Sequence, residues 1–286
     1  MGRRGSFALV GFFIACSSTP QSRVRPLPNA TSAPVAEAAP PAAEVVAFPS
    51  SGLTLHGNLY RPPGAGPFPV VVFNHGSEAS PHAEGQALFY VSHGFVLFAP
   101  HRRGHGLSRD AGEYVGSLQG PDARVAALVT QTDDVMAAVA YVATLPYVDR
   151  ARVAVAGCSF GGIEALFAAE RGTGIVAAID FAGGAMSWTR SDALRERMKT
   201  AAMNLRIPVL FLQAENDFDT SPSRVLFETA RAAGRDVRMR IFPPWGTTHE
   251  DGHAFCRGGA SPPWSDEVLS FLRSVRAFRG RPAVPR

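Results

Sequence analysis

Short, uninterrupted apolar runs recur along most of the chain, separated by longer segments of mixed polarity. Such runs are typical of parallel strands, which are covered on both faces of a sheet. They lie at 69–74, 94–99, 152–156, 175–179 and 207–213, and residues 237–242, in which Arg238 and Arg240 alternate with apolar residues, are predicted to form the last strand. Segments of helix-forming composition lie at 86–92, 130–145, 163–170, 191–203, 224–233 and 265–278. This alternation predicts an α/β fold, with a mostly parallel sheet and helices on both faces.

Two β-prone runs precede the alternation, at 44–48 and 53–61. They flank Pro49-Ser50-Ser51-Gly52, which predicts a hairpin. With the later runs they predict a central sheet of about eight strands. Ligands of such sheets bind at the carboxyl ends of the strands, so candidate chemistry is expected in the loops that follow the apolar runs.

The N-terminus has the pattern of an export signal over residues 1–16. Arg3 and Arg4 precede an apolar run at 7–15 that is too short to span a bilayer. Phe13-Ile14-Ala15-Cys16 resembles the lipobox of a bacterial lipoprotein, in which Cys16 would be the lipidated first residue. Phe13 departs from the usual Leu, so ordinary signal-peptide cleavage is the alternative. We expect an exported protein, either a cell-envelope lipoprotein or a secreted or periplasmic one.

Residues 17–43 are rich in Pro, Ala and Ser and have almost no large apolar side chains. A segment of this composition buries too little surface to offset the entropy of ordering it. It is therefore predicted to be a disordered or extended tether. The folded domain is expected over 44–286, and a membrane would be contacted only through a lipid on Cys16.

Composition and charge narrow the function classes. The chain has 286 residues, 46% of them hydrophobic, and a net charge of +4. Lys199 is its only lysine, so nearly all of its basic residues are arginines. Its arginines are scattered and form no cluster interleaved with aromatic residues, so nucleic-acid binding is not predicted. His249 and His253 have the spacing of a helical zinc site, but they lie in a Gly-rich segment with no further ligand in view. Neither a metal nor another cofactor is expected.

The candidate nucleophile is Ser159 in Gly157-Cys158-Ser159-Phe160-Gly161. This G-x-S-x-G pentapeptide follows the apolar run 152–156 and precedes the helical segment 163–170. A serine at such a strand–turn–helix corner is exposed, because the glycines allow the strand and helix backbones to approach closely. The alternative is a glycine-rich crossover turn with an incidental serine, and the partners of Ser159 decide between the two.

A serine hydroxyl needs a base that takes its proton and a third group that orients the base. If the chain order is serine, acid, histidine, only His249 and His253 can supply the base. His253 is favoured because Gly252 before it allows the sharp turn that would aim an imidazole inward. His249 is the alternative.

The acid should follow a strand and precede the histidine. Asp217 meets both conditions, since it comes after the run 207–213. Glu215 and Asp219 are near alternatives, and Asp180 at the end of the preceding strand is a more distant one.

Acyl transfer also needs backbone donors for a developing oxyanion. The N–H of Phe160, directly after the nucleophile, is the first candidate. The second is the N–H of Ser77 in His75-Gly76-Ser77, which follows the run 69–74. For His75 itself a structural hydrogen bond is favoured over a catalytic role. Segments 102–122 and 183–203 are expected to shape the pocket, with Trp188, Trp245 and the Phe160 ring as candidate walls, although core packing accounts for these aromatics equally well.

Cys158 and Cys256 lie beside the candidate nucleophile and base in the sequence. In an oxidising compartment they could form a disulfide that steadies the histidine loop. Two buried free thiols are the favoured interpretation, because the sequence does not give the separation of their Cβ atoms.

The chain resembles the α/β-hydrolases, and most closely their dienelactone hydrolase-like and prolyl-oligopeptidase-like branch. The resemblance rests on motifs in the family's order: Asn74-His75-Gly76, Arg102-Arg103-Gly104-His105-Gly106-Leu107-Ser108, 149–157, 157–162 and Glu215-Asn216-Asp217. It implies the α/β-hydrolase fold and a serine hydrolase whose triad is Ser159, Asp217 and His253. Dienelactone hydrolases proper use cysteine as nucleophile, so their lactone specificity is not carried over.

The function that the resemblance implies is cleavage of small carboxylic esters through an acyl-enzyme. One alternative is an exported peptidase or amidase, although 17–43 leaves no room for the propeller domain of prolyl oligopeptidases. The other is a catalytically inactive hydrolase fold that serves as a binding lipoprotein.

Overall fold

The computed structural model describes residues 1–2 and 41–279. The predicted signal, Cys16 and nearly all of the predicted tether lie outside the described residues. The strands are β1 (Glu44–Ser50), β2 (Leu53–Tyr60), β3 (Phe68–Asn74), β4 (Val96–His101), β5 (Val148–Cys158), β6 (Ala177–Phe181), β7 (Val209–Ala214) and β8 (Val237–Phe242).

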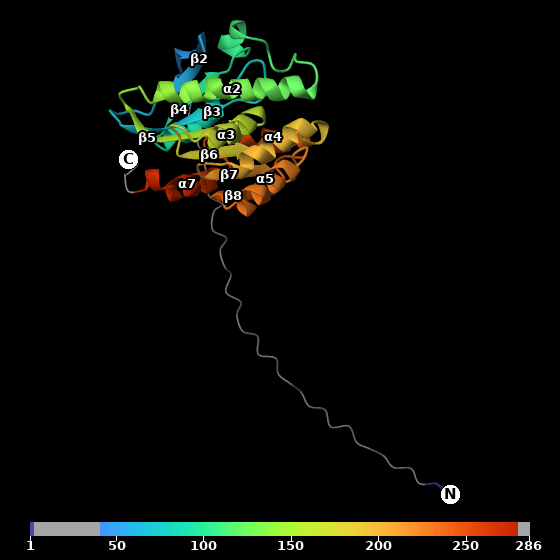
Figure 1. Cartoon of the computed structure of the whole chain (residues 1–286). Helices are drawn as coiled ribbons and strands as arrows, with labels where there is room; N and C mark the ends of the chain where they lie inside the picture. The colour runs from blue at the N-terminus through green and yellow to red at the C-terminus, as the bar shows by residue number, and fades with distance from the viewer. Residues whose placement is uncertain (3–40, 280–286) are drawn as a thin grey trace, which may run out of the picture. The chain divides into compact units, whose positions relative to one another are not determined.

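These strands form one eight-stranded sheet in the order β1-β2-β4-β3-β5-β6-β7-β8. Strand β2 is antiparallel to both β1 and β4. All other neighbours are parallel. The strand order places β3 and β5 at the centre of the sheet (Figure 1). The predicted α/β-hydrolase fold and its mostly parallel sheet are confirmed.

The helices are α1 (Glu84–Ser92), α2 (Pro121–Val142), α3 (Phe160–Arg171), α4 (Asp192–Met203), α5 (Ser221–Ala232), α6 (His249–His253) and α7 (Ser265–Ser274). Short 3₁₀ segments lie at η1 (Gly106–Ala111), η2 (Trp188–Arg190), η3 (Ala254–Arg257) and η4 (Arg276–Phe278).

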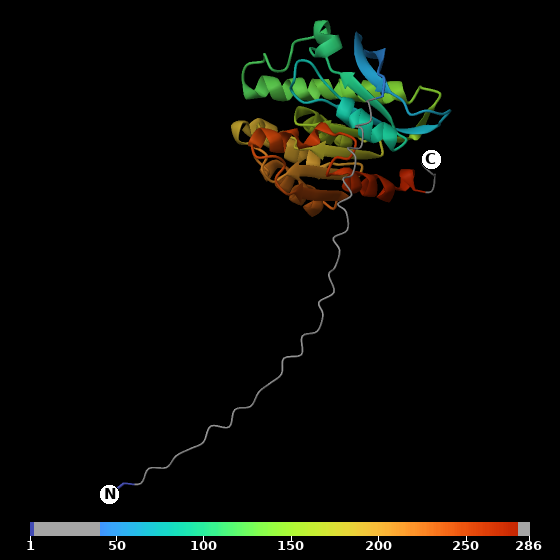
Figure 2. The same cartoon turned by 180° about the vertical axis from the view of Figure 1, so that it is seen from behind.

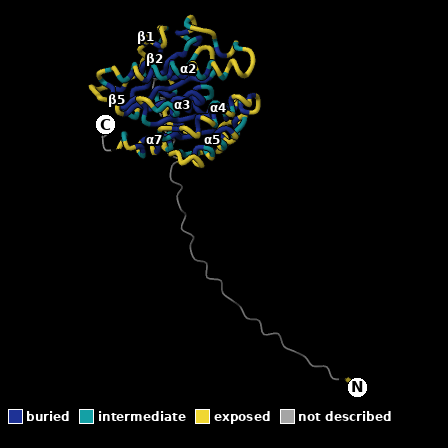
Figure 3. The backbone as a smooth tube through the Cα atoms, viewed as in Figure 1, coloured by how far each residue is buried: buried dark blue, intermediate teal, exposed yellow. Residues whose placement is uncertain are grey.

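The side chains of each central strand divide between two apolar cores because successive residues of a strand face opposite sides of the sheet. Val70 and Val72 of β3 pack with α2, α3, α4 and α5 on one face. Val71 and Phe73 pack with α1 and α7 on the other. Figure 2, the view from behind, brings α1 to the front, and Figure 3 shows the buried strands between partly exposed helices. Every residue of the parallel strands β3, β4, β6 and β7 is buried, as their apolar runs predict, whereas the edge strand β8 is only partly buried.

Helix α2 begins at Pro121, earlier than the predicted start at 130. Gly120 precedes it, proline occupies its first turn, and Asp122 is acidic there, all of which favour a helix start. These first turns are largely exposed and so lack the apolar periodicity on which the prediction relied. By length and composition α2 could cross a membrane, but its buried residues belong to the core, as expected of a core helix.

The segment that carries both candidate bases also differs from prediction. Residues 249–253 form the short helix α6 where a loop was expected. Thr248 Oγ1 accepts a hydrogen bond from Asp251 N, and Asp251 Oδ2 accepts one from Thr248 N, each at 3.0 Å. This capping box starts the helix and fixes the direction in which the chain reaches His253.

Candidate active site

Ser159 lies at the corner between β5 and α3 in a strained backbone conformation. Its φ of 57° and ψ of −116° are unusual for a residue with a side chain. The corner is held by the bond from Ser159 N to Phe181 O, 2.9 Å long, and by two bonds from the first turn of α3 to Ser159 O. Strain that the surrounding structure holds in place is typical of functional sites, and this one presents the Ser159 side chain to a cavity.

The glycines of the pentapeptide are required by close backbone contacts. A Cβ on Gly157 would collide with the carbonyl group of Gly161. A Cβ on Gly161 would collide with the carbonyl group of Asn74 at the end of β3. Any larger residue at either position would push α3 away from the sheet, so G-x-S-x-G is here a packing requirement as well as a motif.

Asp217 and His253 are joined by a hydrogen bond. His253 Nδ1 lies 2.9 Å from Asp217 Oδ1. The Asp217 side chain is fully buried, and it also accepts bonds from Phe218 N at 2.7 Å and from Gln213 Nε2 at 2.8 Å. This bond occupies His253 Nδ1 and leaves Nε2 as the ring nitrogen that is not bound to Asp217.

Gln213 is a partner of the acid that the sequence analysis did not identify. Ser223 Oγ donates to Gln213 Oε1 at 2.8 Å, which orients the amide so that its nitrogen faces Asp217. Gln213 belongs to β7 and Ser223 to α5, so the carboxylate is fixed by two regular elements. No local motif in the sequence signals this contact.

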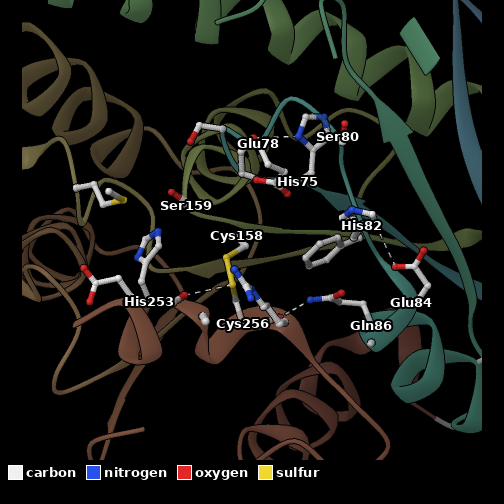
Figure 4. Close-up of a pocket in the computed structure, with 18 of the residues that line it drawn as sticks. His75, Glu78, Ser80, His82, Glu84, Gln86, Cys158, Ser159, His253 and Cys256 are labelled. Carbon is white, nitrogen blue, oxygen red and sulfur yellow. Dashed lines mark hydrogen bonds and ion pairs between the residues drawn. A yellow bond between two sulfur atoms is a disulfide. The ribbon is translucent and has the colours of Figure 1, made fainter. Parts of the chain in front are cut away.

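Ser159 and His253 line one cavity of about 720 Å³ (Figure 4). Within the described residues no hydrogen bond joins their side chains. Catalytic hydrogen bonds often tighten only when substrate is bound, so this geometry is compatible with a serine–histidine pair.

The alternative base and acids lie elsewhere in the structure. His249 is exposed and its Nδ1 is 3.0 Å from Asn216 O. Asp219 Oδ1 accepts from Ser221 N, the first residue of α5, at 2.8 Å, and Glu215 is exposed. Asp180 is buried and accepts from Gly183 N at 2.7 Å, and burial raises its pKa to about 7. None of these groups is bonded to His253 in the described part of the chain.

The two expected oxyanion donors are both without an acceptor among the described residues. Phe160 N is the first amide of α3, directly after Ser159. Ser77 lines the cavity together with Ser159. The neighbouring amide, Gly76 N, is already occupied by Glu78 Oε1 at 3.2 Å. Within the loop at 75–77, Ser77 therefore supplies the available donor.

Cys158 and Cys256 form a disulfide, with their Cα atoms 5.9 Å apart. The favoured interpretation of two free thiols is wrong, because the fold brings together residues that are 98 positions apart in the sequence. The bridge connects the residue before Ser159 to the 3₁₀ segment that follows His253. Gln86 Nε2 of α1 also donates to the carbonyl oxygen of Cys256.

The cavity is lined by charged side chains as well as apolar ones. Charged or ionisable side chains line it at Glu78, His82, Glu84, Glu250 and Arg257, and apolar ones at Phe73, Met186 and Phe218. Tyr114 and Met186 come from the two segments expected to shape the pocket.

The aromatic candidates for the walls are not in the lining. Trp188 is buried in the core, and the Phe160 ring packs against the same core. Trp245 is 46% exposed and its ring contacts Phe255. Core packing or surface exposure therefore accounts for these three residues.

Three buried histidines stand behind the loop that carries Ser77. Burial, and secondly the charge of Arg102, lowers the pKa of His75 well below its ordinary value. Burial lowers the pKa of His101 and of His105 to about 4. Each ring nitrogen Nδ1 bonds to the backbone, at Gly76 O, Leu107 N and Arg103 O respectively. These neutral imidazoles organise the loops after β3 and β4.

Arg102 and Glu164 form a buried pair in the same region. Burial lowers the pKa of Arg102 and raises that of Glu164, and each group opposes the shift of the other. Among the described residues no group of three His, Cys, Asp or Glu side chains is arranged to hold a metal ion.

A model of the dienelactone hydrolase family matches residues 55–267. The chain belongs to this family. The match covers β2 to the start of α7 and includes every strand and loop of the site described above. A search of curated proteins found no match.

Solved structures with a similar fold include one protein assigned as a dienelactone hydrolase and several larger peptidases. The acylaminoacyl peptidase of Pyrococcus horikoshii is similar over 84% of this chain and 43% of its own, with a TM-score of 0.66 and 19% identity. The dipeptidyl peptidase 4 of Porphyromonas gingivalis is similar over 82% of this chain and 35% of its own, with a TM-score of 0.61 and 20% identity. A Klebsiella pneumoniae protein assigned as a dienelactone hydrolase is similar over 82% of this chain and 97% of its own, with a TM-score of 0.60 and 17% identity.

The chain thus spans less than half the length of the peptidases but matches nearly all of the dienelactone hydrolase relative. At these identities the likeness establishes the fold alone. Family membership and fold together mark the protein as a hydrolase, and the chemistry has to be argued from its own site.

Proposed function

We propose that the protein is a serine hydrolase that cleaves carboxylic esters through an acyl-enzyme, with Ser159, His253 and Asp217 as its triad. The observation that carries the proposal is the 2.9 Å bond between His253 and the buried Asp217, in the cavity that the strained Ser159 also lines. An incidental serine in a crossover turn would need neither the strain nor the partners.

In the proposed mechanism Ser159 Oγ attacks the ester carbonyl while His253 Nε2 takes its proton. Asp217 keeps the imidazole in the required tautomer and stabilises its positive charge. The oxyanion receives hydrogen bonds from the N–H groups of Phe160 and Ser77. His253 then protonates the departing alcohol, and a water molecule, activated by the same histidine, releases the acid and restores Ser159.

An ester is preferred over a peptide as substrate because the family whose model matches residues 55–267 is that of the dienelactone hydrolases, and a lactone is a cyclic ester. The competing proposal is an amidase or peptidase, and hydrolysis of an aminoacyl-anilide faster than of the matching ester would favour it. A catalytically inactive binding protein would hydrolyse neither and would resist a fluorophosphonate probe.

We also propose that the protein is exported. The charged and apolar pattern of residues 3–16 supports this, with Cys16 as the lipidation site if the envelope lipoprotein alternative holds. The Cys158–Cys256 bridge supports it independently, because disulfides persist mainly in oxidising compartments.

The direct test is the Ser159→Ala variant assayed with a short p-nitrophenyl ester. We expect kcat to fall by about 10³-fold or more, because the nucleophile is gone while the fold keeps its core. Thermal unfolding followed by circular dichroism should change little. The matched control is Ser274→Ala, at the end of α7 and outside the cavity lining, which should keep its activity. Unchanged turnover in Ser159→Ala would refute the proposed nucleophile.

A further inference from the structure

One buried arginine holds the loop that carries Ser77 from the side away from the cavity. The Arg102 side chain is 0% exposed and follows β4. Its Nη1 donates to His75 O at 2.7 Å, and its Nη2 donates to Gly76 O at 2.8 Å. Two carbonyl groups of the loop are thus bound to a single planar guanidinium, and the third, Ser77 O, accepts from the Tyr114 hydroxyl at 2.6 Å.

These two bonds determine where the loop's N–H groups point. In a trans peptide the C=O and the N–H point in opposite directions, and the only cis bond among the described residues is Gly66–Pro67. Fixing Gly76 O on Arg102 therefore turns Ser77 N–H away from Arg102. Ser77 lines the cavity, and no acceptor within the described chain binds this N–H. A backbone donor is in this way left free beside Ser159.

The same guanidinium contacts the helix that carries the other donor. Arg102 Nε lies 2.9 Å from Glu164 Oε1, and the Glu164 side chain is also 0% exposed. Glu164 is one turn after Phe160 at the start of α3. Gln131 Oε1 of α2 also accepts a hydrogen bond from Arg102 Nε at 3.3 Å. Arg102 thus connects the two chain segments whose N–H groups flank Ser159.

We propose that Arg102 is a positioning residue of the oxyanion hole, which sets the orientation of Ser77 N–H and ties it to the helix that begins at Phe160. The inference rests on the proposed serine-hydrolase function. Donors that are already oriented need not reorganise as charge develops on the substrate, which is why their placement affects the transition state more than substrate binding. A lysine has one ammonium in place of a planar fork, so it could not bind both carbonyl groups in the same way.

Arg103 provides a matched control for a purely structural role. It follows Arg102 in the loop after β4. Its Nε donates to Asp134 Oδ2 of α2 at 2.9 Å, and its Nη2 donates to Asp134 Oδ1 at 2.7 Å. Its side chain has no bond to residues 75–77 among the described residues. Arg103→Lys therefore disturbs a neighbouring ion pair of similar kind without changing the carbonyl contacts of the donor loop.

The experiment compares wild type, Arg102→Lys and Arg103→Lys in the full chain. For a short p-nitrophenyl ester we expect Arg102→Lys to lower kcat by about 10- to 100-fold and to change KM by less than about 3-fold. Binding of phenylboronic acid, which forms a tetrahedral adduct with the active serine, should weaken by a similar factor. Arg103→Lys should stay within about 3-fold of wild type in all three quantities.

Loss of folding is controlled with a second variant. Replacing Arg102 alone can leave Glu164 buried without a partner, which is strongly destabilising. The double variant Arg102→Met with Glu164→Met removes both charged groups and fills the site with apolar volume. We expect it to unfold cooperatively but to lose kcat as Arg102→Lys does. A folded double variant with wild-type kcat and boronate affinity would overturn the inference.

The outcomes separate the inference from the proposed function. If wild type binds the boronate and hydrolyses the ester while Arg102→Lys does both equally well, the positioning role is refuted and the serine hydrolase stands. If wild type does neither, the proposed function fails and the positioning role fails with it. Equal losses in Arg102→Lys and Arg103→Lys would also overturn the inference, because they would show a general packing effect.

Discussion

The two halves of the candidate site are held in place by different means. Ser159 stands between a central strand and its helix, where backbone contacts with Phe181, Gly161 and Asn74 leave it almost no freedom. His253 ends the short helix α6, and residues 243–250 before it are all exposed. It is held by Asp217 and, just after it, by the disulfide at Cys256. The position of the proposed nucleophile is thus fixed by the sheet, whereas that of the proposed base depends on a hydrogen bond and a disulfide.

This difference suggests where each half is vulnerable. Changes to the glycines that pack around Ser159 should lower folding stability as well as activity, whereas removal of the Ser159 hydroxyl alone should lower activity only. Changes on the histidine side should lower activity first, because α6 contributes little to the two cores.

The largest effect is expected from the base itself. His253→Ala should lower kcat by about 10⁴-fold or more, because the variant lacks the base proposed to take the proton of Ser159. The matched control is His249→Ala in the same helix. The His249 ring contacts Asn216 O, so this variant should keep its kcat within about 3-fold of wild type. Steady-state kinetics on a p-nitrophenyl ester compare the two. A larger loss in His249→Ala would reassign the base.

A smaller effect is expected when the disulfide is removed. The Cys158→Ser/Cys256→Ser variant should lose about 10- to 100-fold in kcat, because a shift of the base by about 1 Å already costs that much. Its free energy of unfolding should fall by about 2–5 kcal/mol, the range for native disulfides that close long loops. Urea unfolding and kinetics measure both quantities.

Reduction provides the control for the disulfide. Dithiothreitol should lower the activity of wild type toward that of the double serine variant and should leave the variant itself unchanged. A fully reduced wild type with full kcat would show that the Cys158–Cys256 bridge does not position His253.

The smallest effect concerns the acid stability of the serine side. His101 and His105 have their pKa lowered by burial to about 4, so between pH 6.5 and about 4 the unfolded chain binds protons that the folded chain excludes. They therefore destabilise the fold as the pH falls through this window. In His105→Asn the free energy of unfolding should depend less steeply on pH. The slope should decrease by less than the value for one proton, which is about 1.4 kcal/mol per pH unit. Urea titrations of wild type and variant at pH 4 to 7 test this, and identical slopes would contradict it.

The parts of the molecule that short-range patterns encode could be predicted from the sequence. Buried parallel strands are uninterrupted apolar runs, so the sheet and its fold class were predictable. The elbow at Ser159 was predictable because strand, glycines and helix are contiguous. Asp217 and His253 could be selected by their order in the chain, and the structure joins them directly.

The parts that depend on distant contacts could not be predicted. Ser223 orients Gln213, and Arg102 binds the carbonyl group of His75. Each contact joins two segments that are brought together only by the fold. The disulfide spans 98 positions, and the sequence does not give the distance between its cysteines. The exposed start of α2 has a helical cap but no apolar stripe, so periodicity placed its beginning too late.

The central claim is that Ser159 is a nucleophile activated by His253. Its most direct test is labelling of the full chain with a fluorophosphonate, followed by mass spectrometry of the peptide that contains residues 153–171. We predict stoichiometric modification of Ser159 in wild type, labelling that is slower by at least about 10²-fold in His253→Ala, and none in Ser159→Ala. Absence of labelling in folded wild type, or labelling of another residue, would contradict the account.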